Sequence, residues 1–213
     1  HQEQLQFFTN ISHELRTPLS LILGPLEKLK KDFPSPLALP YYDMIQRNAK
    51  RLLALTNELM DFRKVESGAL QLHVMQGNIN IFLTEIAEEF QDLAIEKGIE
   101  FKILPTLSQQ TQWFDRQILE KIAINLLSNA FKYTSNGKKI EIQILESLEN
   151  FQPQYQSQLR ITNGFTSSQM LYLRVADQGI GISQESISQL FERYYRTTES
   201  HIGSGIGLAF VKS

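Results

Sequence analysis

The chain has 213 residues, of which 42% are hydrophobic and 21% charged, and its formal net charge is −2. These values are ordinary for a globular protein and give no sign of nucleic-acid binding. The absence of cysteine excludes disulfides and thiolate metal sites. No apolar run approaches the roughly 18 residues of a membrane span, so we expect no membrane contact by this chain. Both ends fall inside predicted helices, and we expect the chain to be a fragment of a longer protein.

An apolar repeat predicts a first helix from near the start to about Lys31, packed against other helices. Its members recur at steps of three and four, with Ser12 at the one missing position: Leu5, Phe8, Leu15, Leu19, Ile22, Leu26 and Leu29. His13 lies one residue beyond this seam and is followed by Glu14. A nearly neutral imidazole can act as a nucleophile, and a carboxylate beside it can hold or take its proton. Pro18 is expected to kink the helix. A surface histidine on a structural coiled coil is the alternative interpretation.

A proline-rich break over residues 32–40 predicts a turn, and a second helix is expected from about Tyr41 to Val65, with Gly68 as its stop. An antiparallel hairpin of two helices leaves one apolar face uncovered. Pairing with a second copy makes a four-helix bundle, so residues 1–68 predict a homodimer. The alternative is a hairpin that packs on the chain's own second domain.

From Leu70 onward the pattern predicts an α/β sandwich over residues 69–213, incomplete at its C-terminal end. Alternation predicts strands over 70–74, 99–103, 111–114, 139–145 and 170–176, with helices over 79–97 and 115–132. Asp115 is a fair N-cap for the second of these helices. Residues 146–169 are interpreted as a solvated insertion without chemistry. His73 and His201 are isolated, so we interpret them as surface and loop residues.

Four polar residues share one face of the predicted helix over 115–132, because they are spaced by steps of four, three and one: Asn125, Asn129, Lys132 and Tyr133. Amide oxygens suit Mg²⁺, a lysine can reach phosphate, and a tyrosine ring can flank a base or ribose. Taken alone, such a helix is more often a half-solvated amphipathic helix.

Five of the eleven glycines fall between residues 179 and 207. Asp177, Gly179 and Gly181 follow a predicted strand, where a carboxylate can accept a hydrogen bond from an adenine amino group and glycines let the backbone approach the ring. The segment 203–208 carries three alternating glycines and opens a helix, whose first N–H groups form an anion site. The two glycine motifs, in this order after the Asn-bearing helix, indicate a nucleotide site.

The stretch Ser12-His13-Glu14-Leu15-Arg16-Thr17-Pro18-Leu19 resembles the phospho-acceptor box of the sensor histidine kinases without a gap. Residues 125–133, 177–181, 191–196 and 203–208 resemble that family's asparagine, glycine and phenylalanine boxes, which belong to the ATP-binding fold shared with Hsp90, DNA gyrase and MutL. The resemblance covers nearly the whole chain apart from residues 146–169. It implies a helical hairpin followed by an α/β sandwich ATP-binding domain.

Carried over residue by residue, the resemblance implies His13, Glu14 and Thr17 as catalytic residues and Asn129 as the Mg²⁺ ligand. The residues implied to bind ATP are Asn125, Asn129, Lys132, Tyr133, Asp177, Gly179, Gly181, Arg196, Gly203, Gly205 and Gly207. Residues 197–202 would be a short lid over the nucleotide. The implied activity is ATP-dependent autophosphorylation of His13 and relay of the phosphoryl group to an aspartate on a receiver domain. Glu14 and Thr17 also match the family pattern for dephosphorylating that receiver.

Residues 8–12 and 62–68 look most like the hybrid sensors of Bacteroides-type bacteria, in which receiver and DNA-binding domains follow on the same polypeptide. The resemblance places this chain in the cytoplasmic portion of an inner-membrane sensor protein. Two rival functions remain open from the residues alone. A chaperone- or gyrase-type ATPase explains the glycine boxes but gives His13 no role. A non-catalytic dimer scaffold predicts no nucleotide binding.

Overall fold

The computed structural model describes residues 2–104, 111–148, 159, 161, 170–192, 195 and 205–212, without the side chains of residues 2–14, 62 and 66. Contacts divide the chain into two compact units. One holds residues 1–70 together with 201–211 and 213, and the other holds residues 71–200 together with 212. None of the described helices is both long and apolar enough to cross a membrane.

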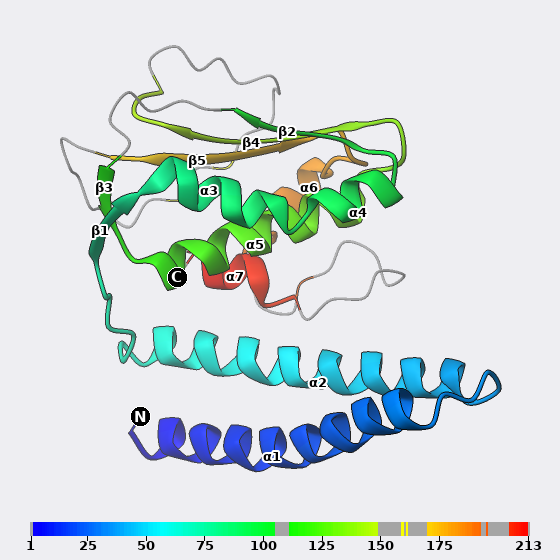
Figure 1. Cartoon of the computed structure of the whole chain (residues 1–213). Coiled ribbons are helices and arrows are strands. Elements are labelled where there is room, and N and C mark those ends of the chain that lie inside the picture. Colours follow the sequence, from blue (N-terminus) through cyan, green and yellow to red (C-terminus); the bar gives the residue numbers. More distant parts are fainter. Residues whose placement is uncertain are drawn as a thin grey trace. The chain divides into compact units, whose positions relative to one another are not determined.

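The first unit is built on two antiparallel helices, α1 (Gln2–Asp32) and α2 (Leu39–Glu66), drawn in blue and cyan in Figure 1. Both helices and the proline-rich turn between them confirm the predicted hairpin. α1 continues through Pro18 and Pro25 without a break in its assignment, so the kink at Pro18 stays a prediction. Pro40 lies in the first turn of α2, where its missing N–H costs nothing. A short helix, α7 (Gly207–Lys212), completes the described elements of the chain.

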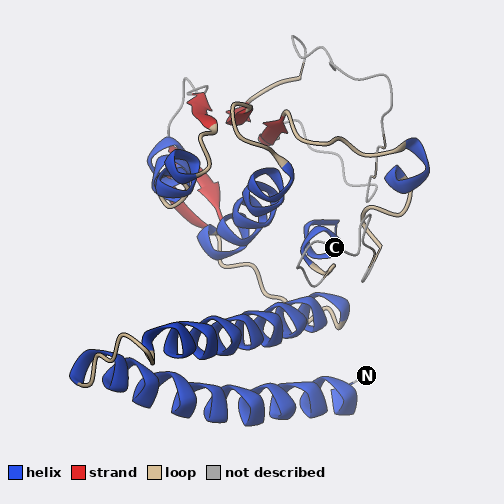
Figure 2. Ribbon diagram, turned by 90° about the vertical axis from the view of Figure 1, so that its right-hand side faces the viewer, coloured by secondary structure: helices blue, strands red, loops and turns tan. Residues whose placement is uncertain are grey.

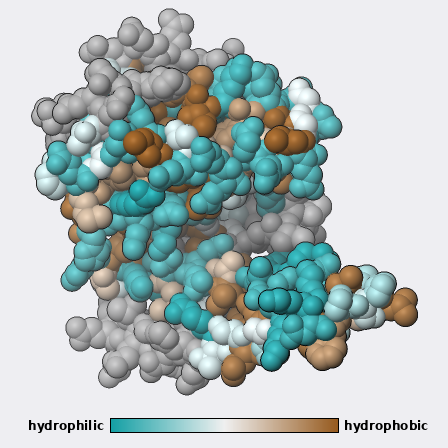
Figure 3. All heavy atoms as spheres, in the orientation of Figure 1, coloured by the Kyte–Doolittle hydropathy of each residue, from teal (hydrophilic) through white to brown (hydrophobic). Residues whose placement is uncertain are grey.

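Polar bonds across the hairpin fix one antiparallel register. Arg16 Nη2 donates to Asn57 Oδ1 at 2.8 Å, and Lys30 Nζ donates to Asp43 Oδ1 at 2.6 Å. A longer bond of 3.4 Å joins Gln46 to Glu27 in the same register. Each step forward on α1 therefore matches one step back on α2. At the turn itself, hydrophobic side chains reach solvent, as Figure 3 shows at the far end of the hairpin.

The second unit is an α/β sandwich, which confirms the predicted fold class. Its three-stranded sheet has the order β2-β4-β5, where β2 (Glu100–Leu104) runs parallel to β4 (Lys139–Leu145) and β4 antiparallel to β5 (Tyr172–Asp177). A separate two-stranded sheet pairs β1 (Met75–Asn78) with β3 (Thr111–Phe114). The helices α3 (Ile79–Glu88), α4 (Gln91–Glu96) and α5 (Arg116–Tyr133) cover one face of the larger sheet (Figures 1 and 2). The four-residue α6 (Gln184–Ile187) follows β5.

Period-two alternation in β4 builds the core of this sandwich. Ile140, Ile142 and Ile144 are buried, and the residues between them are half-buried on the other face. Phe131 of α5 stacks on Phe90 at 5.3 Å and meets Phe101 edge-on at 5.2 Å. These ring contacts tie the last turn of α5 to the sheet. The position of that turn matters because it carries Lys132 and Tyr133.

Two sequence predictions in this unit are wrong in detail. Residues 70–74 are not a strand, since Leu72 and Val74 are exposed and the paired strand begins at Met75, opposite Phe114. The predicted helix over 79–97 is two helices, because the chain turns at Glu89 and restarts with Phe90 at the cap of α4. Most of the predicted insertion over 146–169 lies outside the described residues. Leu159 and Ile161, which are described, lie in no strand, and His201 is not described.

Asp115 caps α5, as its position in the sequence predicts. Its carboxylate accepts from Ile118 N at 3.0 Å and from His73 N at 2.6 Å. Burial alone would raise the pKa of Asp115, but the backbone N–H groups of His73, Ile118 and Gln117 outweigh burial and lower it. A carboxyl with a lowered pKa stabilises the fold above its unfolded pKa, and this stabilisation is lost as the pH falls through the folded pKa.

We therefore expect Asp115→Ala to lower the free energy of unfolding by about 1 kcal/mol at pH 7, the usual cost of losing an N-cap. The difference from wild type should shrink below about pH 4, where the unfolded carboxyl is itself protonated. Urea unfolding at several pH values measures both effects. Asp92→Ala removes the same charge from the exposed first turn of α4 and serves as the control. An equal loss in the two variants would contradict the cap assignment.

Candidate nucleotide-binding and phospho-acceptor sites

The last turns of α5 carry four of the predicted nucleotide residues. Asn125, Asn129, Lys132 and Tyr133 are all half-buried, in contrast to the fully buried Ala123, Leu127, Ala130 and Phe131 of the same helix. Asn125 Nδ2 donates to the Lys121 carbonyl oxygen at 2.9 Å, which orients its amide along the helix. The Lys132 ammonium lies 4.8 Å from the centroid of the Tyr133 ring. The helix thus presents amides, a cation and a ring in sequence along one face.

The loop after β5 is shaped by its own carboxylate. Asp177 ends β5 and is exposed, and its Oδ1 accepts from Gly179 N at 2.9 Å. Gln178 anchors the turn to the start of β4, with bonds to Lys139 at 3.0 Å through its backbone N–H and at 3.1 Å through its side-chain oxygen. Gly181 has a φ of 72°, which favours glycine. The loop therefore holds Asp177 in a fixed place at the edge of the sheet.

The end of α5 and this loop meet directly. Ile180 N donates to the Tyr133 carbonyl oxygen at 3.2 Å. A Cβ added at Gly179 would lie 2.6 Å from that same oxygen and 2.7 Å from Asp177 Oδ1. These distances admit glycine and no larger residue without a shift of backbone. The structure thus brings Tyr133 together with Asp177 and Gly179, which follow it by more than forty positions in the sequence.

The chemistry of this junction fits an adenine nucleotide. An exposed carboxylate can accept from an exocyclic amino group, and the side-chain-free Gly179 leaves the backbone open to close approach. Among the described residues, no group of three or more His, Cys, Asp or Glu could hold a metal ion. The amide oxygen of Asn129, together with phosphate oxygens and water, is a ligand set that Mg²⁺ accepts.

The predicted phospho-acceptor residues lie on α1. His13 and Glu14 belong to the helix by their backbone, and their side chains fall outside the described set, while Thr17 one turn later is exposed. The bond between Arg16 and Asn57 was not predicted from the sequence. Only the place of Arg16, three residues after His13, drew attention to it. No sequence pattern links it to Asn57, which is 41 positions away.

The other predicted ATP-binding residues fall outside the described residues or in the hairpin unit. Arg196 and Gly203 lie outside the described residues, as does the expected lid over 197–202. Gly205 has a φ of 72°, and Gly207 begins α7. Within the hairpin unit, Ile206 and Ala209 pack against Leu59 of α2. The roles of Gly203, Gly205 and Gly207 at the phosphates stay predictions.

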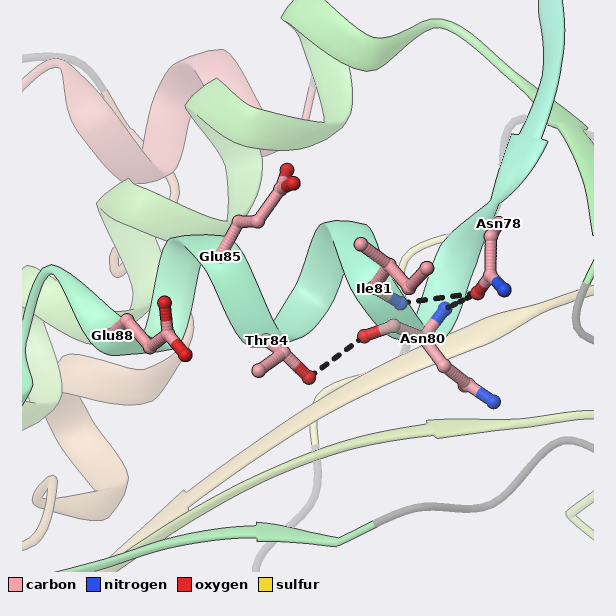
Figure 4. A pocket seen from close by; sticks show the side chains of 6 residues that line it. All are labelled: Asn78, Asn80, Ile81, Thr84, Glu85 and Glu88. Carbon is pink, nitrogen blue, oxygen red and sulfur yellow. Dashed lines mark hydrogen bonds between the residues drawn. The ribbon is translucent and has the colours of Figure 1, made fainter.

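A hollow of about 360 Å³ lies on α3, and none of the predicted site residues lines it (Figure 4). Several of its polar groups bond within the same unit: Asn78 Oδ1 caps α3 by accepting from Asn80 N and Ile81 N, each at 3.1 Å, and Thr84 donates to the Asn80 carbonyl. Glu85 forms an ion pair with Arg116. We assign this hollow to the packing of α3 and β1.

Two family models match the chain in tandem. The model of the His Kinase A (phospho-acceptor) domain matches residues 3–68, and that of the histidine kinase-, DNA gyrase B- and HSP90-like ATPase matches residues 114–213. The chain belongs to the sensor histidine kinases. The matched ranges place His13 in the phospho-acceptor domain of this family and place Tyr133 and Asp177 in its ATPase domain.

Similar proteins carry names of the same family. Histidine kinase P4 of Formosa agariphila is 36% identical over 221 residues, which cover 100% of this chain and 15% of that protein. The autoinducer 2 sensor kinase/phosphatase LuxQ of Vibrio vulnificus is 31% identical over 97% of this chain and 23% of its own length. The crystal structure of full-length ShkA in complex with AMPPNP superposes with a TM-score of 0.74 at 27% identity, over 97% of this chain and 39% of that one. The chain therefore spans less than a quarter of the length of these two sequence relatives.

Proposed function

We propose that this chain is the catalytic core of an ATP-dependent histidine autokinase. The observation that supports it most is the junction at which the Tyr133 carbonyl, Gly179 and Asp177 meet, with Lys132 directly before Tyr133 in the last turn of α5. That junction has the groups to bind a purine base and, one helical turn away, a phosphate chain. The phospho-acceptor box supplies a nucleophile that a simple ATPase would not need.

In this proposal Asp177 accepts the adenine amino group, Gly179 and Gly181 line the base, and Tyr133 flanks the nucleoside. Asn129 and Asn125 face the metal-bound phosphates, and Lys132 and Arg196 neutralise phosphate charge. Gly203, Gly205 and Gly207 border the phosphates with their backbone. Asn129 would hold Mg²⁺, which would neutralise phosphate charge during the transfer.

At His13, an imidazole nitrogen attacks the γ-phosphorus of ATP. The N–P bond forms as the bond from phosphorus to the bridging oxygen breaks, and ADP leaves with that electron pair. Glu14 holds the ring's other nitrogen and takes its proton. Catalysis rests mostly on positioning and charge neutralisation, as is usual for phosphoryl transfer.

The phosphohistidine then passes its phosphoryl group to a receiver aspartate. We propose that the receiver lies on the same polypeptide, as in the Bacteroides-type hybrid sensors, and that Glu14 and Thr17 position water for its dephosphorylation. The longer protein is proposed to be an inner-membrane sensor with this part in the cytoplasm, by analogy with relatives named as sensors. The functional form is proposed to be a homodimer through the hairpin.

We expect wild-type chain incubated with labelled ATP and Mg²⁺ to acquire acid-labile, base-stable label. His13→Ala should acquire at least about 1,000-fold less label than wild type, because no other group would accept the phosphoryl group. A thermal-shift titration with Mg·ATP should give the same stabilisation for both proteins. Release of free phosphate without labelled protein would instead support the ATPase. No thermal shift with nucleotide would support the scaffold.

A further inference from the structure

Arg16 is the positively charged residue nearest to His13 on the same face of α1, and it is hydrogen-bonded across the hairpin to an uncharged side chain. Arg16 follows His13 by three residues, so the two positions are neighbours on one face of α1. Its guanidinium donates to Asn57 Oδ1 of α2 at 2.8 Å. This bond fixes a long side chain that would otherwise sample many rotamers.

The bond between Arg16 and Asn57 differs from the contact at the other end of the hairpin, because the side chain of Asn57 carries no charge. Lys30 is bound there by Asp43, whose carboxylate neutralises it. The pKa of Asp43 is lowered, first of all by its hydrogen bond to Lys30. Among the side chains that the structure describes, no carboxylate pairs with Arg16. Asn57 therefore holds the Arg16 guanidinium in place and leaves its positive charge intact.

We propose that Arg16 contacts the phosphoryl group during transfer to His13 and that Asn57 is its positioning residue. This inference rests on the proposed autokinase function. Arg16 is exposed, and a guanidinium has five N–H donors in a planar fork, so those that Asn57 does not use remain available to phosphate oxygens. The negative charge on the transferred group is thus met from α1 itself, in addition to the cations of the nucleotide site. Arg16 takes and gives no proton in this step.

The experiment distinguishes two roles of Arg16: a positive charge that acts on the phosphoryl group, and a hydrogen bond that only stabilises the hairpin. Asn57→Asp keeps an acceptor at the same place and adds a negative charge, so the tie is kept while Arg16 is neutralised. We expect Asn57→Asp to lower kcat for autophosphorylation about tenfold, with KM for ATP unchanged and with Tm equal to or above that of wild type. Arg16→Gln should lower kcat at least as much, and Arg16→Lys should restore part of it, since a lysine keeps the charge without the fork.

Lys30→Gln is the matched control, because it breaks the other tight cross-hairpin bond far from His13. It should lower Tm without changing kcat. The inference is overturned if Asn57→Asp and Arg16→Gln both label at the wild-type rate, or if kcat falls only in step with Tm across all the variants. If wild type itself acquires no label at His13, the proposed function fails instead, so the two failures are distinguishable.

Discussion

Replacing Gly179 with alanine is expected to remove most of the affinity for ATP while the chain stays folded. The added Cβ would lie 2.6 Å from the Tyr133 carbonyl oxygen and 2.7 Å from Asp177 Oδ1. The first of these atoms is backbone that already accepts from Ile180 N, so it cannot move aside cheaply. The loop over 177–181 must shift instead, and the Asp177 carboxylate shifts with it. Loss of one hydrogen bond to a charged group, about 1.5–3 kcal/mol, raises Kd roughly ten- to a hundredfold.

Isothermal titration of ADP and of a non-hydrolysable ATP analogue measures this change. Gly137→Ala is the control for a destabilised loop glycine, because Gly137 has a positive φ, 75°, which strains an alanine, but no atom lies within 4 Å of its added Cβ. Its strain lowers Tm without touching the nucleotide junction, so its Kd should equal that of wild type. Wild-type affinity in Gly179→Ala would show that the base does not bind against this loop.

The parts of this fold that the sequence predicted well are those with a repeating local pattern. The two hairpin helices and β4 follow from apolar spacing, and the cap at Asp115 follows from its place before a helix. An alternation of apolar and polar residues predicts a strand wrongly where no neighbouring strand is there to pair with it. Leu72 and Val74 alternate as a strand would, yet they are 63% and 48% exposed, because the opposite strand spans only residues 111–114. The break between α3 and α4 has a tertiary cause as well, since Phe90 turns there to stack on Phe131.

The candidate site was likewise predictable where its motifs are local and unpredictable where its contacts are tertiary. Residue types and spacing select the amide face of α5 and the Asp177 loop, because both are local motifs. The contact of Gly179 with the Tyr133 carbonyl is a tertiary approach across 46 positions, and no spacing rule specifies it. The same holds for the bond of Arg16 to Asn57, which exists because the hairpin register aligns them. The sequence therefore predicts which groups take part, and the fold determines which of them touch.

A single charge on the uncovered face of the hairpin is expected to dissociate the proposed homodimer. Leu19, Leu26, Ala49 and Met60 are buried in the hairpin unit. A second set of side chains remains open and repeats every seven residues: Leu15, Ile22 and Leu29 on α1, which are 47%, 46% and 42% exposed, with Ile45 and Leu52 on α2, 46% and 54% exposed. Heptad spacing on both helices is the pattern of a seam between helices. A second copy would cover this seam and complete a four-helix bundle.

Ile22→Glu places a carboxylate in the middle of that seam, and two-fold symmetry places it there twice. An unpaired buried charge costs several kcal/mol, so micromolar protein should pass from dimer to monomer in sedimentation or light scattering. Ser20→Glu puts the same charge on an exposed position of the same helix and should leave the dimer intact. If the four-helix bundle is the form in which His13 is phosphorylated, label should fall with the dimer fraction while thermal stabilisation by Mg·ATP is kept. A wild-type chain that stays monomeric, or an Ile22→Glu variant that stays dimeric, would show that this face is covered by something other than its own copy.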